Sequence, residues 1–212
     1  MTLLLALDTS TRIASVAAFD GEQVVSETSW LAGREHSTRL LVEAEACLER
    51  IGRAPSDLSG LVVARGPGSF TGVRVALSVA KGMAAALAVP AWGVSTLDVL
   101  AAAVAGVDVP VRVVLEAGRG RYASALYEHG ECVEAPRLAT LDELVELLHV
   151  PTLVLGELPA DARARLRSIP TARLASAASS MRRAGYLAEL GHALAQRGDP
   201  GDPRMLDALY VT

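Results

Sequence analysis

The chain has 212 residues, of which 51% are hydrophobic and only two are cysteines, and its net charge is −4. This composition indicates a globular chain with room for one large domain or two small lobes, and it excludes a disulfide framework or a cluster of thiol ligands. The mildly negative charge argues against a protein that binds nucleic acid by itself through a broad basic face.

Two apolar stretches are tested first as membrane segments. Residues 1–8 lack a basic leader and a small-residue cleavage site, and they are too short to span a bilayer, so we expect a strand there. The stretch 73–88 is interrupted by Arg74, Lys81 and Gly82. We therefore expect no membrane association. The two cysteines, Cys47 and Cys132, suit a reducing cytosol, so we expect a cytoplasmic protein.

The first half of the chain is predicted to be a strand meander followed by alternating helices and strands. Asp20-Gly21 separates two alternating apolar runs, which is a strong hairpin signal. Ser37 is the expected N-cap of a helix that reaches about Ile51, and Gly52 can end it. The expected strands are 3–8, 13–19, 23–28, 61–64 and 91–94, and the expected helices are 38–51, 73–88 and 96–105.

The second half is expected to form a separate, smaller lobe. Gly106-Val107-Asp108-Val109-Pro110 is a plausible boundary, which gives an N-terminal lobe 1–105 and a C-terminal lobe 106–212, with the last helix able to pack back on the first lobe. The expected strands are 111–116, 122–128 and 152–155, the expected helices are 141–149, 160–167 and 180–197, and a loop at 198–204 precedes a short docking segment, 206–211.

A glycine loop joins the strand 61–64 to the helix 73–88. Its glycines are Gly66, Gly68 and Gly72, which allow a tight backbone and a close approach by a ligand or a neighbouring element. Thr71 is the expected N-cap of the helix that follows. The spacing fits neither the dinucleotide fingerprint nor the Walker A loop. A phosphate site and a loop shaped for close packing therefore both remain open.

The full run from Arg65 to Ala76 (RGPGSFTGVRVA), with Ala80-Lys81-Gly82 following, is far more specific. It resembles the signature of the TsaB (YeaZ) family of bacterial tRNA-modification proteins. The resemblance is dense over residues 1 to about 100 and thin afterwards. It implies an α/β protein of the actin/Hsp70/sugar-kinase-like (ASKHA) fold, with two lobes that each hold a mixed sheet and flanking helices. The other segments that agree are 5–11, His36-Ser37 with Arg39-Leu40-Leu41, 93–97, 119–127 and 209–211.

The loop after the first strand is the place where kinases and ATPases of the implied fold wrap a phosphate and use an Asp to help hold a metal. Those loops generally carry a glycine two residues after the Asp, and here that position is Ser10. An Asx or Ser/Thr turn that closes a hairpin is the simpler interpretation. Asp8, Thr9, Gly66 and Gly68 remain candidates for cofactor binding, although we expect no cofactor.

Gly118-Arg119-Gly120 is the only candidate for the second phosphate loop of such ATPases. It follows Glu116-Ala117, where TsaB relatives more often show Asp-Ala-Arg. The simplest interpretation of these glycines is a tight hairpin.

The chain lacks the metal ligands of the family's catalytic relatives. TsaD proteins carry a His-x-x-x-His pair some distance after a related loop, and alignment by hand places these histidines on Thr96 and Leu100. Neither side chain replaces imidazole as a ligand. The four histidines have no metal-ligand spacing, and no Ser-His-Asp or Cys-His set can be assembled. We therefore expect neither a catalytic residue nor a metal site.

The resemblance implies that the helices 38–51 and 73–88 pair with TsaD. The second of these helices is crowded with small residues, which would let another helix approach closely. The alternative is that both helices only cover the sheet; an apolar patch left over would mark a partner site. The candidate partner-binding residues are Leu40, Leu41, Ala44, Cys47, Leu48, Arg74, Leu77, Ala80, Lys81 and Ala84.

Two functions from different classes follow. The first is a non-catalytic scaffold that binds a TsaD-like transferase and, with a TsaE-like ATPase, supports threonylcarbamoyl transfer to the adenosine beside the tRNA anticodon. Such a subunit would meet tRNA only through the complex and would form a homodimer when alone. The alternative is an ATP-dependent phosphotransferase that uses Asp8 and the loops at Gly66 and Gly118.

Overall fold

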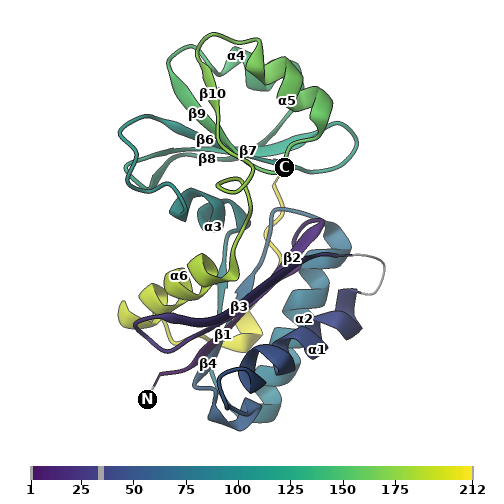
Figure 1. Cartoon of the computed structure of the whole chain (residues 1–212), viewed down its shortest axis with the longest axis vertical. Coiled ribbons are helices and arrows are strands. Elements are labelled where there is room, and N and C mark those ends of the chain that lie inside the picture. Colours follow the sequence, from purple (N-terminus) through teal and green to yellow (C-terminus); the bar gives the residue numbers. More distant parts are fainter. Residues whose placement is uncertain (1, 33–35, 212) are drawn as a thin grey trace. The chain divides into compact units, whose positions relative to one another are not determined.

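The computed structural model describes residues 2–32 and 36–211 (Figure 1). The chain divides into two compact units. The first unit holds residues 1–99 and 182–209, and the second holds residues 100–181 and 210–212.

A five-stranded mixed sheet forms the first unit, in the order β3-β2-β1-β4-β5. β1 lies at its centre, antiparallel to β2 and parallel to β4, so that Leu7 lies opposite Val16 on one side and Val63 on the other. All five residues of β1 are buried, as expected for a central strand covered on both faces. The strands are β1 (Leu4–Asp8), β2 (Ile13–Phe19), β3 (Val24–Leu31), β4 (Gly60–Ala64) and β5 (Ala91–Val94).

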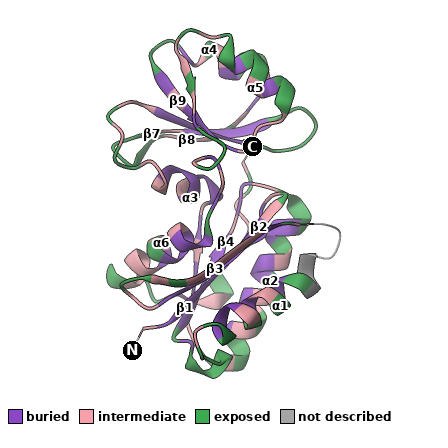
Figure 2. Ribbon diagram, in the orientation of Figure 1, coloured by how far each residue is buried: buried purple, intermediate pink, exposed green. Residues whose placement is uncertain are grey.

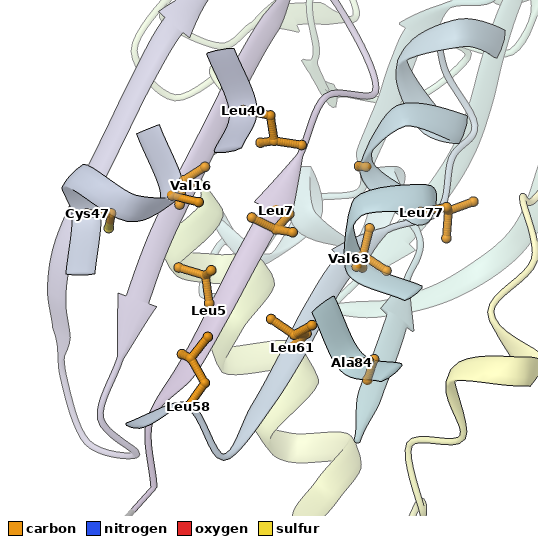
Figure 3. Packing of buried hydrophobic residues seen from close by; sticks show 14 of the residues in the cluster. Leu5, Leu7, Val16, Leu40, Cys47, Leu58, Leu61, Val63, Leu77 and Ala84 are labelled. Carbon is orange, nitrogen blue, oxygen red and sulfur yellow. The ribbon is translucent and has the colours of Figure 1, made fainter. Parts of the chain in front are cut away.

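Three helices cover the two faces of this sheet. Because side chains alternate along a strand, Leu5 and Leu7 pack under α1 (His36–Glu49) and α2 (Phe70–Leu87), as Figure 3 shows. Leu4 and Ala6 point to the opposite face, where α6 (Ala184–Gln196) packs. The core of the unit therefore has two layers, one on each side of the sheet.

The C-terminal segment runs back along the outer strand of the same sheet. The Ala91 N–H donates to the Gly201 carbonyl at 2.8 Å, and the Leu209 N–H donates to the Arg65 carbonyl at 2.6 Å. Leu206, which follows the short 3₁₀ helix η2 (Pro203–Met205), is buried in the core under α2. This segment covers β5, which would otherwise be an open sheet edge.

The second unit contains another five-stranded mixed sheet, in the order β10-β9-β6-β7-β8. Its helices α4 and α5 bury Leu144 and Leu166 against Val114 and Val154. The elements of this unit are β6 (Val111–Glu116), β7 (Tyr122–Glu128), β8 (Glu131–Ala139), α4 (Leu141–Glu146), β9 (Thr152–Leu155), α5 (Ala160–Arg167) and β10 (Ala172–Leu174). Two further elements are the short 3₁₀ helix η1 (Pro55–Asp57), which lies in the first unit, and the helix α3 (Thr96–Ala102), which lies where the first unit ends. Two mixed sheets with flanking helices are the ASKHA arrangement that the resemblance implied.

Several boundaries differ from those expected. The unit boundary falls at residue 99 rather than 105, and residues 182–209 belong to the first unit because α6 covers the second apolar face of its sheet. β8 and β10 were not expected, because the exposed edge strand β8 carries charged residues and Pro136 instead of a clean apolar alternation. The expected capping role of the Ser37 side chain lies outside the described side chains.

The N-terminus of α2 also differs. The helix begins at Phe70, and its N-cap is Ser69, whose hydroxyl accepts the Gly72 N–H at 3.2 Å, whereas Thr71 lies inside the first turn. Among the described helices, α2 is the one that is long and apolar enough to cross a membrane by length and composition. In the structure its Val73, Ala76 and Ala84 pack into the core of the first unit.

Candidate functional site

A buried ion pair lies at the carboxyl end of β1. The Arg182 Nε donates to Asp8 Oδ2 at 2.8 Å, and both side chains are 0% exposed. The other carboxylate oxygen, Oδ1, accepts the Ser10 N–H at 2.7 Å and also the Ser10 hydroxyl. The first of these two bonds defines the expected Asx turn. The carboxylate of Asp8 is thus neutralised and hydrogen-bonded within the chain.

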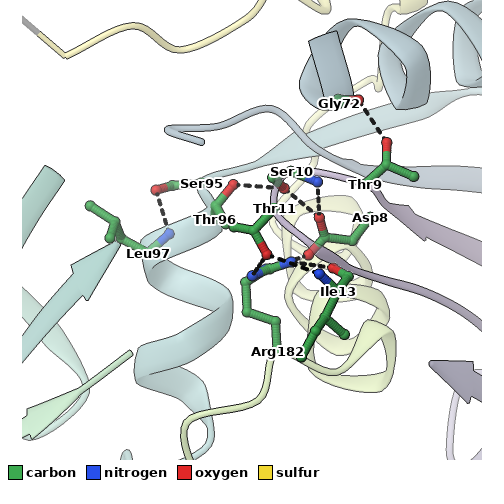
Figure 4. A network of polar contacts seen from close by, with 10 residues as sticks. All are labelled: Asp8, Thr9, Ser10, Thr11, Ile13, Gly72, Ser95, Thr96, Leu97 and Arg182. Carbon is green, nitrogen blue, oxygen red and sulfur yellow. Dashed lines mark hydrogen bonds and ion pairs between the residues drawn. The ribbon is translucent and has the colours of Figure 1, made fainter. Parts of the chain in front are cut away.

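Arg182 also fixes the rest of this turn (Figure 4). Its Nη1 donates to the Thr11 hydroxyl and its Nη2 to the Ile13 carbonyl, each at 2.7 Å. On the other side, the Thr96 hydroxyl donates to the Ser10 hydroxyl at 3.1 Å. These contacts join the start of α3, the turn after β1 and Arg182, two residues before α6, in one buried cluster.

The glycine loop packs directly against this turn. A Cβ atom at Gly68 would lie 2.2 Å from the Ser10 carbonyl oxygen, and one at Gly72 would lie 2.0 Å from the Thr9 carbonyl oxygen. Two hydrogen bonds complete the contact: the Ser69 N–H donates to the Ser10 carbonyl at 2.6 Å, and the Thr9 hydroxyl donates to the Gly72 carbonyl at 2.6 Å. The glycines are required because backbone meets backbone here.

Gly66 makes a similar approach to the C-terminal segment. Its φ is +99°, and a Cβ atom would lie 2.8 Å from the Leu209 carbonyl oxygen. The groups that face all three glycines are therefore carbonyl oxygens of the chain itself. Because carbonyl oxygens repel a phosphate, this geometry favours the close-packing interpretation of the loop over the phosphate site.

The second candidate loop forms the β6–β7 turn of the second unit. Gly118, Arg119 and Gly120 all have positive φ, and the Arg121 N–H donates to the Gly118 carbonyl at 3.0 Å. This is the geometry of a tight hairpin, as the simpler interpretation expected.

The positions aligned with the TsaD histidines serve other purposes. The Thr96 hydroxyl is engaged by Ser10, and Leu100 is fully buried. Within residues 2–32 and 36–211, no group of three or more His, Cys, Asp or Glu side chains is placed to hold a metal ion.

The structure corrects the expected partner-binding face. Seven of the ten candidate residues are at most 6% exposed and lie in the core between the sheet and the helices α1 and α2. These side chains cover the sheet and present little or no surface to a partner while the unit stays folded. The seven residues are Leu40, Ala44, Cys47, Leu48, Leu77, Ala80 and Ala84.

Cys47 illustrates how closed this interior is. Its thiol lies 3.5 Å from the Ser26 carbonyl, to which it donates. Burial raises the pKa of the Cys47 thiol, because the thiolate would lose its hydration. Cys47 therefore acts as a small apolar core residue.

The remaining candidates lie on the other side of the same helices. Leu41 is 48% exposed, and its neighbour Val42 on α1 is 58% exposed. On α2, Phe70 is 57% exposed, and the Arg74 guanidinium lies 3.7 Å from the centre of its ring. We call Leu41, Val42, Phe70 and Arg74 the outer face; Figure 2 shows exposed positions along both helices.

Lys81, the last of the ten candidates, is partly exposed and makes an ion pair. Its Nζ lies 3.6 Å from Asp207 Oδ1, so the side chain reaches the C-terminal segment. This exposed ion pair contributes little to stability.

Arg182 was not singled out from the sequence, although it is the centre of the buried cluster. It lies 174 residues from Asp8 along the chain, and it stands beside another arginine, Arg183, that is exposed and pairs with Glu27. No spacing or motif distinguishes the two. The turn Asp8–Thr11 is the only local signal of the cluster.

Comparisons with known proteins agree with this fold. A family model described as "TsaD: tRNA N6-adenosine threonylcarbamoyltransferase" matches residues 28–174. A solved structure described as "YeaZ from Pseudomonas aeruginosa" superposes with a TM-score of 0.78 at 27% identity, and another from the same organism, an uncharacterized protein with similarity to peptidase YEAZ, with a TM-score of 0.83 at 26% identity. Both superpositions cover 100% of each chain. The chain is thus an ASKHA-fold protein with a TsaD-like domain.

Similar curated proteins identify the family within this fold. The "tRNA threonylcarbamoyladenosine biosynthesis protein TsaB" of Bacillus subtilis (strain 168) is 36% identical over 126 residues, which is 59% of this chain and 55% of the relative. The protein with the same description in Escherichia coli (strain K12) is 36% identical over 141 residues, 62% of this chain and 61% of the relative. The matched part thus spans less than two thirds of these relatives. The chain belongs to the TsaB (YeaZ) family.

Proposed function

We propose that this protein is a non-catalytic subunit in the biosynthesis of threonylcarbamoyladenosine in tRNA. It binds a TsaD-like transferase and, together with a TsaE-like ATPase, supports that enzyme. The protein is cytoplasmic, and it meets tRNA only through the complex, in keeping with its negative net charge.

The observation that carries the proposal is the pairing of Asp8 with Arg182. The carboxylate at the end of β1 is the group that would have to hold a metal in a phosphotransferase of this fold. Here one of its oxygens accepts from Arg182 and the other from Ser10, and the whole side chain is buried. The glycine loop beside it faces the Thr9 and Ser10 carbonyls. This arrangement supports a protein that has the ASKHA fold but does not catalyse phosphate transfer.

The outer face supports the second half of the proposal. Leu41, Val42 and Phe70 are each about half exposed on helices that also cover the sheet. The two helices contact each other, and exposed apolar side chains on adjacent helices suit a protein interface. Since α1 and α2 both cover the same face of the sheet, a partner helix can contact both of them.

Reconstitution tests the function. The chain, a TsaD-like transferase and a TsaE-like ATPase are combined with tRNA, ATP and the carbamoyl donor made by a separate enzyme, and modified adenosine is measured. We expect product only when the transferase is present, with this chain raising its rate. Modification by this chain alone at the rate of the complete set would rule out the non-catalytic role.

Calorimetry with Mg-ATP distinguishes the proposed non-catalytic subunit from the alternative function, an ATP-dependent phosphotransferase. We expect no heat from the isolated chain at micromolar nucleotide. Tight nucleotide binding by the isolated chain would favour the phosphotransferase instead.

The same face predicts self-association. Without its partner, the outer face can meet a second copy about a two-fold axis, which gives a homodimer weaker than the heterodimer. Light scattering over a concentration series is expected to show the dimer, and the transferase is expected to displace it. A strict monomer at hundreds of micromolar would contradict the homodimer.

A further inference from the structure

We propose that Arg182 is a positioning residue that holds the segment after β1 in place. This segment fixes the N-terminal end of α2, which presents Phe70 and Arg74 of the outer face to a partner protein. The inference rests on the proposed function for the identity of the partner. The positioning itself can be tested without the partner.

The first step is the lock on the turn. Arg182 donates to three different groups of the segment from Asp8 to Ile13: a carboxylate, a hydroxyl and a main-chain carbonyl. An arginine presents its donors in a rigid planar fork, so the three bonds hold this short segment at three points and restrict its conformation. Lysine has one charged nitrogen and cannot reproduce this set.

The second step runs from the turn to α2. Thr9 and Ser10 lie inside the locked segment, and they hold the helix start through the Ser69 N–H and the Gly72 carbonyl. The missing side chains at Gly68 and Gly72 bring the two backbones into direct contact. Displacement of the turn would therefore displace the N-cap residue Ser69.

The third step runs from the helix start to the surface. Phe70 follows the N-cap directly, and Arg74 stacks on its ring one turn later. Both are exposed, and they contribute part of the outer face. A buried residue before α6 thereby sets the conformation of a surface that is distant along the chain, since Phe70 lies 112 residues (182 − 70) before Arg182.

Amide hydrogen exchange at Ser69 is the direct readout, since its N–H donates to the Ser10 carbonyl. We expect Arg182→Ala to speed this exchange by at least about tenfold, while amides of β6 in the second unit keep their rates. Millimolar guanidinium ion, which can occupy the space of the lost side chain, is expected to restore the slow exchange. Arg182→Lys is expected to restore it only partly.

The matched control is Arg183→Ala. Arg183 is the neighbouring arginine, and it pairs with Glu27 at the surface instead of with the turn. We expect this variant to leave the exchange of Ser69 unchanged and to show no response to guanidinium ion. An effect equal to that of Arg182→Ala would overturn the proposal.

A second variant covers the case in which Arg182→Ala does not fold. The double variant Asp8→Asn with Arg182→Met removes both charges together, which buried pairs often tolerate. It still lacks the bonds to Thr11 and Ile13, so we expect a folded chain with fast exchange at Ser69. Wild-type exchange in a folded variant of either kind would overturn the positioning role.

Partner affinity completes the test. We expect Arg182→Ala to weaken binding to the TsaD-like transferase by at least about tenfold, with recovery in guanidinium ion. If the wild-type chain does not bind that transferase, the proposed function fails, whereas the exchange of Ser69 still decides whether Arg182 holds α2. Fast exchange with unchanged affinity would overturn the link to the partner surface.

Discussion

The carbonyl oxygen of Thr9 lies 2.0 Å from the point that a Cβ atom on Gly72 would occupy, so the turn after β1 and the first turn of α2 meet backbone to backbone. No other residue type fits at this helical position without a shift of one backbone against the other. This contact explains why a glycine stands in the first turn of a helix.

Gly72→Ala is therefore expected to destabilise the protein, although alanine is the better helix former. We expect the free energy of unfolding to fall by about 2 kcal/mol, as for other overpacked sites. Urea unfolding measures it. The matched control is Gly82→Ala in the same helix, where no atom lies within 4 Å of the added Cβ. There the change is expected to stabilise by about 0.5–1 kcal/mol, and equal effects at both sites would contradict the backbone contact.

Leu41→Asp separates the outer face from the core. Leu41 is 48% exposed, so we expect a folded chain whose binding to the TsaD-like transferase is weakened about tenfold or more. Val133→Asp, at a 54% exposed position of the second unit, is the control that should bind normally. Circular dichroism shows whether each variant is folded, and calorimetry measures its affinity for the transferase. Equal binding by both variants would exclude Leu41 from the interface.

Ala80→Arg is expected to destabilise the folded chain itself, whereas Leu41→Asp is expected to weaken binding to the transferase. Ala80 is fully buried between α2 and the sheet, so an arginine there is both too large and a charge without water. We expect a loss of more than about 3 kcal/mol in the free energy of unfolding. Thermal unfolding measures it, and a variant as stable as the wild type would show that α2 turns another side to the sheet.

The two thiols are expected to differ in reactivity. Cys132 is exposed, whereas Cys47 is buried and burial raises the pKa of its thiol. Since the thiolate is the reactive form, an aromatic disulfide reagent at neutral pH should label one thiol quickly in the native chain and both after unfolding. Cys132→Ser should leave no fast phase. Two fast thiols in the native wild type would contradict the packing of α1.

Glu134 is expected to make stability depend on acid pH. The Arg112 Nη2 donates to Glu134 Oε2 at 2.9 Å, and this bond holds the pKa of Glu134 below its ordinary value of 4.5. A carboxyl with a lowered folded pKa stabilises the protein fully above its unfolded pKa, and the stabilisation is lost as the pH falls through the folded pKa. Urea unfolding of wild type and Glu134→Gln at about pH 7 and about pH 3.5 should thus show the larger acid loss in the wild type.

The control for this experiment is Glu131→Gln, which removes an exposed carboxylate from the same strand. It should keep the wild-type dependence on pH. An identical acid loss in all three chains would show that the pair with Arg112 adds no stability.

Local signals in the sequence were sufficient for many elements. The strands at Val111–Glu116, Tyr122–Glu128 and Thr152–Leu155 and the helix at Ala160–Arg167 have the predicted bounds, and the glycine loop does join a strand to a helix. These features depend on periodicity and turn residues within a few positions of one another, which a single sequence displays directly. The family signature over the first hundred residues added the fold class.

The tertiary structure alone decided which side of each helix faces inward and what neutralises Asp8. In α1 and α2, alanines and leucines surround much of the helix, so periodicity allowed the inward residues Leu40 and Ala80 to be mistaken for the surface. The partner of Asp8 comes from 174 residues away, next to a second arginine that a sequence cannot tell apart from it. Such choices depend on which distant segments pack together, because burial and charge pairing act through space and leave no spacing along the chain.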